Sequence, residues 1–170
     1  MRTNIEDNLG YWLFYTQRSV AHAFSEVLQK GCEEQGKLYV ITPAQFGVLA
    51  MLFEMGDVTI GLLSKRRGLD APTITGIVKR LEQNGLVERV YDREDRRVVK
   101  VYLTEEGKEI MKALGDPVDA FYDVLTQGFS EAEQSTLRTN LHRIITNVAA
   151  VAPGTGDRFG LLPRDSHCNP

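Results

Sequence analysis

Polar and basic side chains between residues 71 and 83 offer hydrogen-bond donors and positive charge at helical spacing. One stripe of this helix is apolar, at positions i, i+3, i+4 and i+7: Ile74, Ile77, Val78 and Leu81. The rest of its surface carries the candidate contact residues: Thr73, Thr75, Gly76, Lys79 and Arg80. Hydroxyl, ammonium and guanidinium groups can bond to base edges or phosphates, and glycine permits close approach. A solvated face that happens to be basic is the alternative.

The next stretch changes its period from helical to two. Residues 86–91 and 98–103 alternate between faces, which predicts two strands. Between them lies the sequence DREDRR, whose six charged side chains cannot enter a core. The two strands and this charged segment therefore predict a hairpin with a charged tip. Its candidate contact residues are Arg93, Asp95, Arg96 and Arg97.

A short helix precedes these elements, beginning at Thr59 and ending beside Gly68. Its basic end, at Ser64, Lys65, Arg66 and Arg67, could meet a phosphate backbone, although a basic last turn also complements the helix dipole. The order helix, helix, hairpin is typical of a winged helix-turn-helix, in which the second helix enters the major groove of double-stranded DNA.

The sequence LVERVYDREDRRVVKVYLTEEG resembles the wing of MarR-type transcriptional regulators. The resemblance extends loosely over residues 5–150 and excludes the last 20. It implies that Asp95 forms an internal salt bridge orienting Arg97 into a minor groove, where negative potential favours arginine. Strand alternation puts Arg96 and Arg97 on opposite sides, so which of them turns inward stays open. The family also implies a homodimer, an operator as target and, more often than activation, repression.

Charge is distributed unevenly along the 170 residues. The net charge is −3, but residues 64–100 hold ten Lys and Arg against six Asp and Glu. The remainder holds ten against seventeen. A basic patch on an acidic body suits DNA binding, because phosphate contacts are local.

Two helical regions flank the winged unit of residues 42–104, one over residues 5–31 and one over residues 105–150. We therefore expect a mostly α fold with a small β-hairpin wing, in one domain of residues 1–150 with an irregular tail at 151–170. Capping boxes at Thr42 and Ser130, and Asp70 as an N-cap, predict three helix starts. The sequence Gly115-Asp116-Pro117 predicts a kink or break in the last region. No apolar run reaches membrane-spanning length and no secretory signal is visible, so we expect a cytoplasmic protein without a membrane partner.

The first helical region carries a second, aromatic and cationic stripe opposite its apolar one. Its members, Tyr11, Tyr15, Arg18 and His22, could line a pocket for a small aromatic or phenolic acid, or a conjugate of one. Met51 and Met55 are candidate adaptable wall residues. An ordinary amphipathic surface is the alternative.

Other function classes have less support in the sequence. No nucleophile, phosphate-loop or metal spacing is present, so we expect no enzyme, cofactor or metal. Redox sensing through Cys32 stays open, although Glu33, Glu34 and a helix C-terminus raise a thiol pKa. Cys168 has no CxxC partner. A winged-helix module that binds protein instead of DNA is the alternative from another class, against which the charged face argues.

Overall fold

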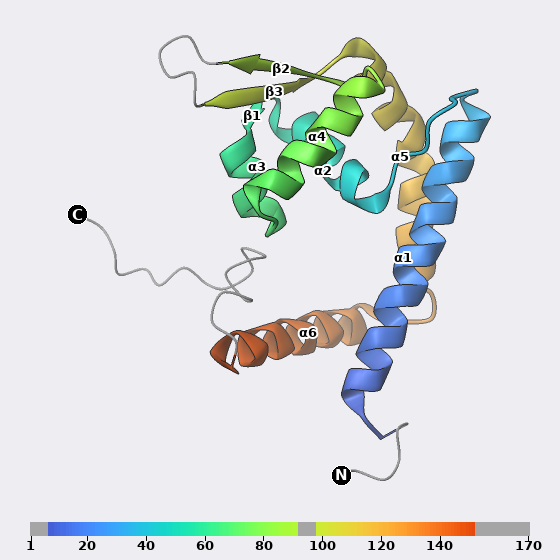
Figure 1. Ribbon diagram of the computed structural model, residues 1–170. Coiled ribbons are helices and arrows are strands. Elements are labelled where there is room, and N and C mark those ends of the chain that lie inside the picture. Colours follow the sequence, from blue (N-terminus) through green and yellow to red (C-terminus); the bar gives the residue numbers. More distant parts are fainter. Residues whose placement is uncertain (1–6, 92–97, 152–170) are drawn as a thin grey trace.

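The computed structural model describes residues 7–91 and 98–151, and within them the chain is mostly helical with one small antiparallel sheet (Figure 1). This confirms the predicted fold class. In chain order the elements are α1 (Leu9–Glu34), α2 (Pro43–Met55), β1 (Val58–Thr59), α3 (Ile60–Arg67), α4 (Ala71–Gln83), β2 (Val87–Tyr91), β3 (Val99–Leu103), α5 (Glu105–Leu125) and α6 (Glu131–Val151).

The predicted helix starts are confirmed by their hydrogen bonds. The backbone N–H of Thr42 donates to Gln45 Oε1 at 2.9 Å, and the N–H of Gln45 donates back to Thr42 Oγ1 at 3.3 Å. The N–H of Thr73 donates to Asp70 Oδ1 at 2.8 Å. Ser130 and Glu133 form the second capping box. Each bond satisfies an N–H that the first helical turn leaves without a partner.

The sheet has the order β1-β3-β2. The predicted hairpin pairs Val87 with Leu103 and Tyr91 with Val99. The strand β1 was not predicted: Thr59 ends this strand and caps α3, which begins one residue later than expected, at Ile60. Two residues are too short to show a period, so only the pairing with β3 reveals the strand.

The core lies between α2, α4, the sheet and α5. The predicted stripe of α4 is buried, with Ile74, Val78 and Leu81 at 0% exposure and Ile77 at 6%. The start of α5 lies very close to the backbone of Leu86, because a Cβ on Gly107 would be 2.1 Å from the Leu86 carbonyl oxygen. The N–H of Thr104 donates to that same oxygen at 3.1 Å. Only glycine therefore fits at position 107 without displacing the backbone.

The first helix differs from its predicted bounds of residues 5–31. Asn8 caps α1, which continues to Glu34. Gly31 does not stop the helix but lies against α5, where a Cβ would come within 2.4 Å of Leu114 Cδ2. Its missing side chain lets α1 and α5 pack closely, and this tertiary contact outweighs the low helix propensity of glycine.

The break expected at Gly115-Asp116-Pro117 is wrong, because α5 runs unbroken from Glu105 to Leu125 with Pro117 inside it. The buried stripe continues across the proline, with Leu114 on one side and Val118 and Phe121 on the other. Packing of this stripe outweighs the backbone hydrogen bond that proline cannot make.

The helix α6 and the N-terminal half of α1 lie apart from this core. Figure 1 shows α6 crossing near the N-terminal half of α1, away from the sheet. No residue of α6 is buried. Among the described residues, no helix has the length and apolar character needed to cross a membrane.

Candidate nucleic-acid interface

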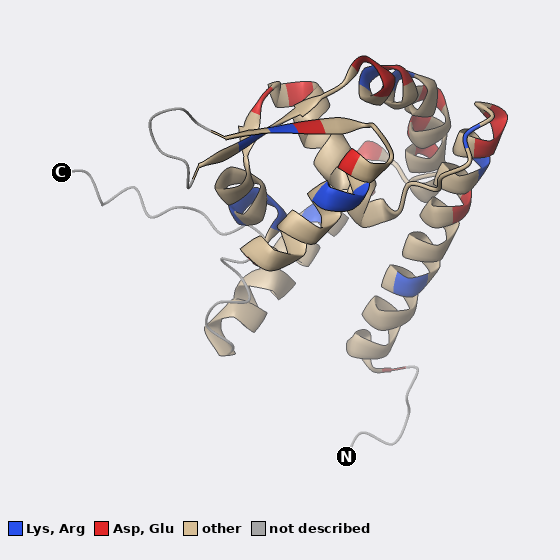
Figure 2. Cartoon of the chain, turned by 45° about the horizontal axis from the view of Figure 1, so that its top comes forward, with Lys and Arg blue, Asp and Glu red and all other residues tan. Residues whose placement is uncertain are grey.

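The helix α4 presents a polar and basic face on the side opposite its buried stripe. Thr73, Gly76, Lys79 and Arg80 are all exposed. A Cβ on Gly76 would meet nothing within 4 Å, so the surface there is open to a close-lying partner. Basic residues also lie on α3 and on the hairpin (Figure 2). This face can donate hydrogen bonds and positive charge to a groove and its phosphates.

Thr75 lies one turn before Lys79 on α4, and both residues are exposed. Its Oγ1 donates to the carbonyl oxygen of Ala71 at 2.7 Å. Ala71 and Thr75 both line a cavity of about 450 Å³ between α4 and the hairpin. The hydroxyl of Thr75 is therefore already bonded within its own helix.

The basic end of α3 divides into exposed and half-buried residues. Lys65 and Arg66 are exposed, whereas Ser64 is half-buried and its Oγ donates to the carbonyl oxygen of Leu69. Ser64 thereby holds the turn between α3 and α4. Arg67, the last residue of this basic end, is half-buried and lies against α2: a Cβ on Gly47 would be 2.3 Å from its Cζ.

The charged hairpin tip, Asp92 to Arg97, lies outside the described residues. The contacts predicted for Arg93, Asp95, Arg96 and Arg97 therefore stay predictions, including the salt bridge that orients Arg97. The two strands on either side of the tip are paired as expected.

The predicted effector residues lie mostly on the exposed N-terminal half of α1. The rings of Tyr11 and Tyr15 come together, with centroids 4.5 Å apart. Arg18 lies over Phe14, with its Cζ 5.5 Å from the ring centroid, and His22 is exposed. On α2, Met51 packs against the core, whereas Met55 is 44% exposed.

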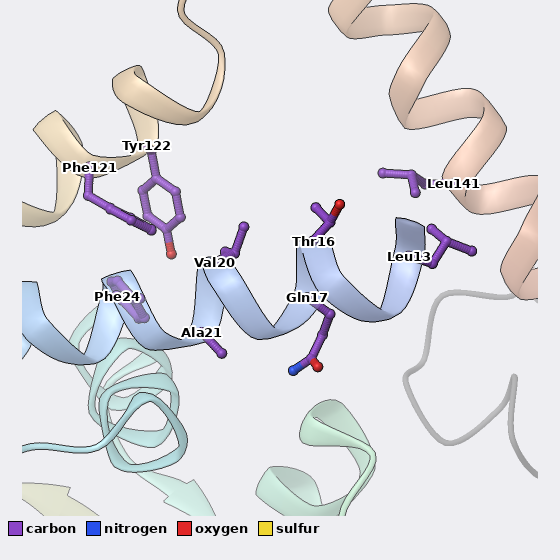
Figure 3. Close-up of a pocket in the computed structure, with 9 residues that line it drawn as sticks. All are labelled: Leu13, Thr16, Gln17, Val20, Ala21, Phe24, Phe121, Tyr122 and Leu141. Atoms are coloured by element: carbon purple, nitrogen blue, oxygen red, sulfur yellow. The ribbon is translucent and has the colours of Figure 1, made fainter. Parts of the chain in front are cut away.

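A cavity of about 390 Å³ lies on another side of α1, facing α5 and α6 (Figure 3). None of the six predicted effector residues lines it; its walls are Leu13, Thr16, Gln17, Val20, Ala21, Phe24, Phe121, Tyr122 and Leu141. Phe24 stacks on Phe121 with ring centroids 5.2 Å apart. In the sequence these side chains carry the same apolar period as any core stripe, so no signal distinguished a cavity wall from a filled core.

Cys32 is completely buried at the end of α1. Burial raises the pKa of its thiol above the ordinary value, an effect partly opposed by the backbone hydrogen bond from Ile41. This direction disfavours the reactive thiolate. Among the described residues, no group of three or more His, Cys, Asp or Glu could hold a metal ion.

A polar cluster next to Cys32 joins the α1–α2 connection to the start of α5. Lys37 Nζ lies 2.6 Å from Glu106 Oε1, and the hydroxyl of Tyr39 donates to the same oxygen at 3.0 Å. These bonds lower the pKa of Glu106, while burial and the hydrogen bond to Glu106 raise the pKa of Tyr39. Sequence reasoning missed the cluster because Glu106 is far from its two partners in the chain.

A helix-turn-helix followed by a hairpin, with a basic outer face on its second helix, defines the class of winged helix-turn-helix proteins. Comparison with known sequences agrees. Residues 41–99 match the MarR family. The chain is 35% identical over 128 residues to the HTH-type transcriptional regulator YsmB of Bacillus subtilis, covering 75% of this chain and 87% of that protein. The chain belongs to the MarR family of transcriptional regulators.

Solved structures share the fold over most of the chain. A mutant of the MarR protein of Escherichia coli, in complex with operator DNA, is 27% identical with a TM-score of 0.64, and the match covers 78% of this chain and 92% of that one. PcaV from Streptomyces coelicolor, in complex with its natural ligand, is 22% identical with a TM-score of 0.74, covering 87% and 99%.

Proposed function

We propose that the protein acts as a homodimer that binds a pseudo-palindromic operator and represses transcription until a small aromatic or phenolic acid, or a conjugate of one, releases it. The observation that carries the DNA part is the exposed face of α4 beside the paired hairpin. Its exposed residues Thr73, Gly76, Lys79 and Arg80 combine positive charge with side chains that can approach and bond to base edges in a DNA groove. The E. coli relative, described in complex with operator DNA, supports the same use of the fold here.

The homodimer is supported by apolar surface that the chain leaves exposed. On α6, Leu137 is 46% exposed, Leu141 39% and Val148 46%. On α1, Trp12 is 53% and Phe14 54% exposed. Several large apolar side chains exposed on two helices indicate an interaction site. A second copy supplies the same two helices, and two-fold symmetry would place two α4 helices on half-sites about 10 base pairs apart.

The effector site is proposed for the side of α1 that carries Tyr11, Tyr15, Arg18 and His22, with Met51 and Met55 of α2 as candidate wall residues. In the homodimer this exposed half of α1 would be covered by the partner, which would close a pocket around the aromatic and cationic groups. Arg18 can hold a carboxylate, and the tyrosine rings can stack on an aromatic ring. PcaV, whose fold is similar, is described in complex with its natural ligand.

Binding of the purified protein to labelled DNA from its own promoter tests this function. The titration is repeated across a salt series and with a panel of benzoic, salicylic and phenolic acids. We expect a steep loss of affinity with salt, because phosphate contacts release counterions, and release of the DNA by one class of acid. Absence of binding at low salt, to promoter and to random duplex alike, would contradict the proposal and favour a protein-binding module.

Arg18→Ala and His22→Ala separate the effector from the DNA part. Both variants should still bind the operator, but at least one should need about tenfold more acid for release, since a charged hydrogen bond contributes about 1.5–3 kcal/mol. Glu26→Ala, at another exposed position of α1, is the matched control and should respond as the wild type does. An unchanged acid response in both Arg18 and His22 variants would remove this pocket.

A further inference from the structure

The helix α4 and the hairpin form two arms that meet at one end and diverge toward the other. Figure 1 shows the arms close together where α4 ends and β2 begins, and apart where α4 starts. The connection between them is short: Asn84 caps α4, Gly85 has a φ of 71°, and β2 begins at Val87. Such a turn fixes where the arms meet, but it constrains their angle only weakly.

The cavity of about 450 Å³ separates the two arms beyond their meeting point. Ala71 and Thr75 line it from α4, whereas Tyr91 and Val99 line it from the hairpin. Side chains of the two arms therefore do not fill the space between them over this length. Thr59, Ile60 and Gly61 of β1 and α3 also line the cavity, and β1 pairs with β3, so the hairpin is held to the rest of the winged unit there. A direct contact between α4 and the hairpin must lie nearer the turn.

Arg89 makes such a contact. It pairs with Val101 across the sheet, and the buried Val101 shows that this face of the hairpin points inward. Arg89 Nη2 donates to Glu82 Oε2 of α4 at 2.5 Å, and this hydrogen bond raises the pKa of Arg89. The two side chains are only 26% and 35% exposed. Arg89 also lines the cavity, so the ion pair links the two arms at the cavity's edge.

A second detail shows that the arginine is held in place. Its Nε is shielded from solvent and has no hydrogen-bond partner among the described residues. A shielded donor without a partner carries a cost, which the chain bears while the guanidinium reaches Glu82. An arginine that served only as surface charge would keep that nitrogen in water.

We propose that Arg89 is a positioning residue for DNA recognition: by pairing with Glu82 it sets the angle between α4 and the wing, and so the distance between the two grooves they reach. This proposal rests on the proposed function, in which α4 and the wing contact one operator half-site. The α4 helix extends eleven residues from Glu82 to Ala71, about 16 Å at 1.5 Å per residue. A rotation of about 10° at the ion pair would move its far end by about 3 Å, close to one base-pair step.

Glu82→Ala tests the proposal against a matched control, Glu88→Ala. Both variants remove one negative charge. Glu88 is exposed and directly precedes Arg89 in β2, so its side chain points to the other face of the hairpin, away from α4. Loss of negative charge alone should leave operator affinity unchanged or raise it, and this is the result expected for Glu88→Ala. For Glu82→Ala we expect operator affinity about tenfold lower, with affinity for random duplex unchanged or higher, because random binding depends on charge and not on the angle of the wing.

Reversing the pair supplies the second readout. The double variant Glu82→Arg with Arg89→Glu restores an ion pair of opposite orientation, so it should bind the operator more tightly than Glu82→Ala does. Thermal unfolding checks that each variant is folded. Equal operator affinity of Glu82→Ala and Glu88→Ala, or a reversed pair that binds no better than Glu82→Ala, would overturn the positioning role. Failure of the wild type itself to bind DNA would instead overturn the proposed function.

Discussion

The winged unit differs from α6 and the N-terminal half of α1 in how far its apolar side chains are buried. In α4 the apolar stripe is between 0% and 6% exposed, and it packs into a core shared with α2, the sheet and α5. In α6 the corresponding leucines, Leu137 and Leu141, remain 46% and 39% exposed. One region therefore completes its core within a single chain, whereas the other presents apolar surface that a second chain can cover. In the proposed function, the winged unit would contact the DNA grooves and the exposed helices would form the dimer.

Gly107→Ala should have the largest effect, because it acts inside the self-contained region. An added Cβ would lie 2.1 Å from the Leu86 carbonyl oxygen, so the backbone must move at the junction of α5 and the sheet. We expect unfolding free energy to fall by about 3 kcal/mol, in the range of overpacked cores. Urea unfolding followed by circular dichroism measures it.

Gly115→Ala is the matched control on the same helix. A Cβ there meets nothing within 4 Å, so stability should stay equal or rise by up to about 1 kcal/mol through helix propensity. Equal losses in the two variants would show that Gly107 has no special contact.

Leu141→Glu tests the other side of the comparison. If a second chain covers Leu141, the variant loses about 2 kcal/mol of apolar burial and places a carboxylate in the interface. The dissociation constant of the dimer should therefore rise at least about 30-fold. Sedimentation equilibrium measures it. Thr139→Glu, at an exposed polar position of α6, should dimerise normally, and equal behaviour of the two variants would break the distinction between the regions.

Lys79→Ala should affect DNA binding without affecting assembly. Loss of a base or phosphate contact should lower operator affinity about tenfold, and a base contact would also alter sequence preference. Fluorescence anisotropy with operator variants measures both effects. Lys112→Ala removes the same charge from an exposed position of α5 and should bind as the wild type does; a similar loss there would mean that only total charge matters.

The smallest effect expected is a pH dependence at the junction of α1 and α5. Lys37 and Tyr39 lower the pKa of Glu106 below its ordinary value of 4.5. A lowered pKa stabilises the folded state at pH above 4.5, and this contribution is lost as the pH falls through the lower, folded value. Thermal unfolding between pH 3 and 7 should therefore show a weaker acid dependence for Glu106→Gln than for the wild type. Parallel curves would show that the cluster contributes nothing measurable.

Local features of the sequence predicted the parts of the structure that depend on local physics. The caps at Thr42, Asp70 and Ser130 were predictable, because a cap and its N–H are three residues apart. The stripe of α4 was predictable because helical period and burial coincide there.

Features that depend on contacts between distant residues could not be predicted in this way. Nothing near Gly31 in the sequence shows that α5 lies against it, and nothing near Glu106 shows that Tyr39 bonds to it. Pro117 was misinterpreted because its local cost is visible in the sequence while the packing of Val118 and Phe121 that outweighs it is not. In the candidate site, the exposed polar face of α4 was predictable from its helical period. The ion pair between Glu82 and Arg89 was not, because it depends on how the hairpin packs against α4.

The mass of the free protein and of its complex with operator DNA tests the central claim most directly. Light scattering coupled to gel filtration measures both at micromolar concentration. The account predicts about twice the chain mass of 19.1 kDa for the free protein, and two chains on each operator duplex. A free mass of 19.1 kDa with one chain on each duplex would contradict it, because the exposed surface of α1 and α6 would then have no second copy to cover it.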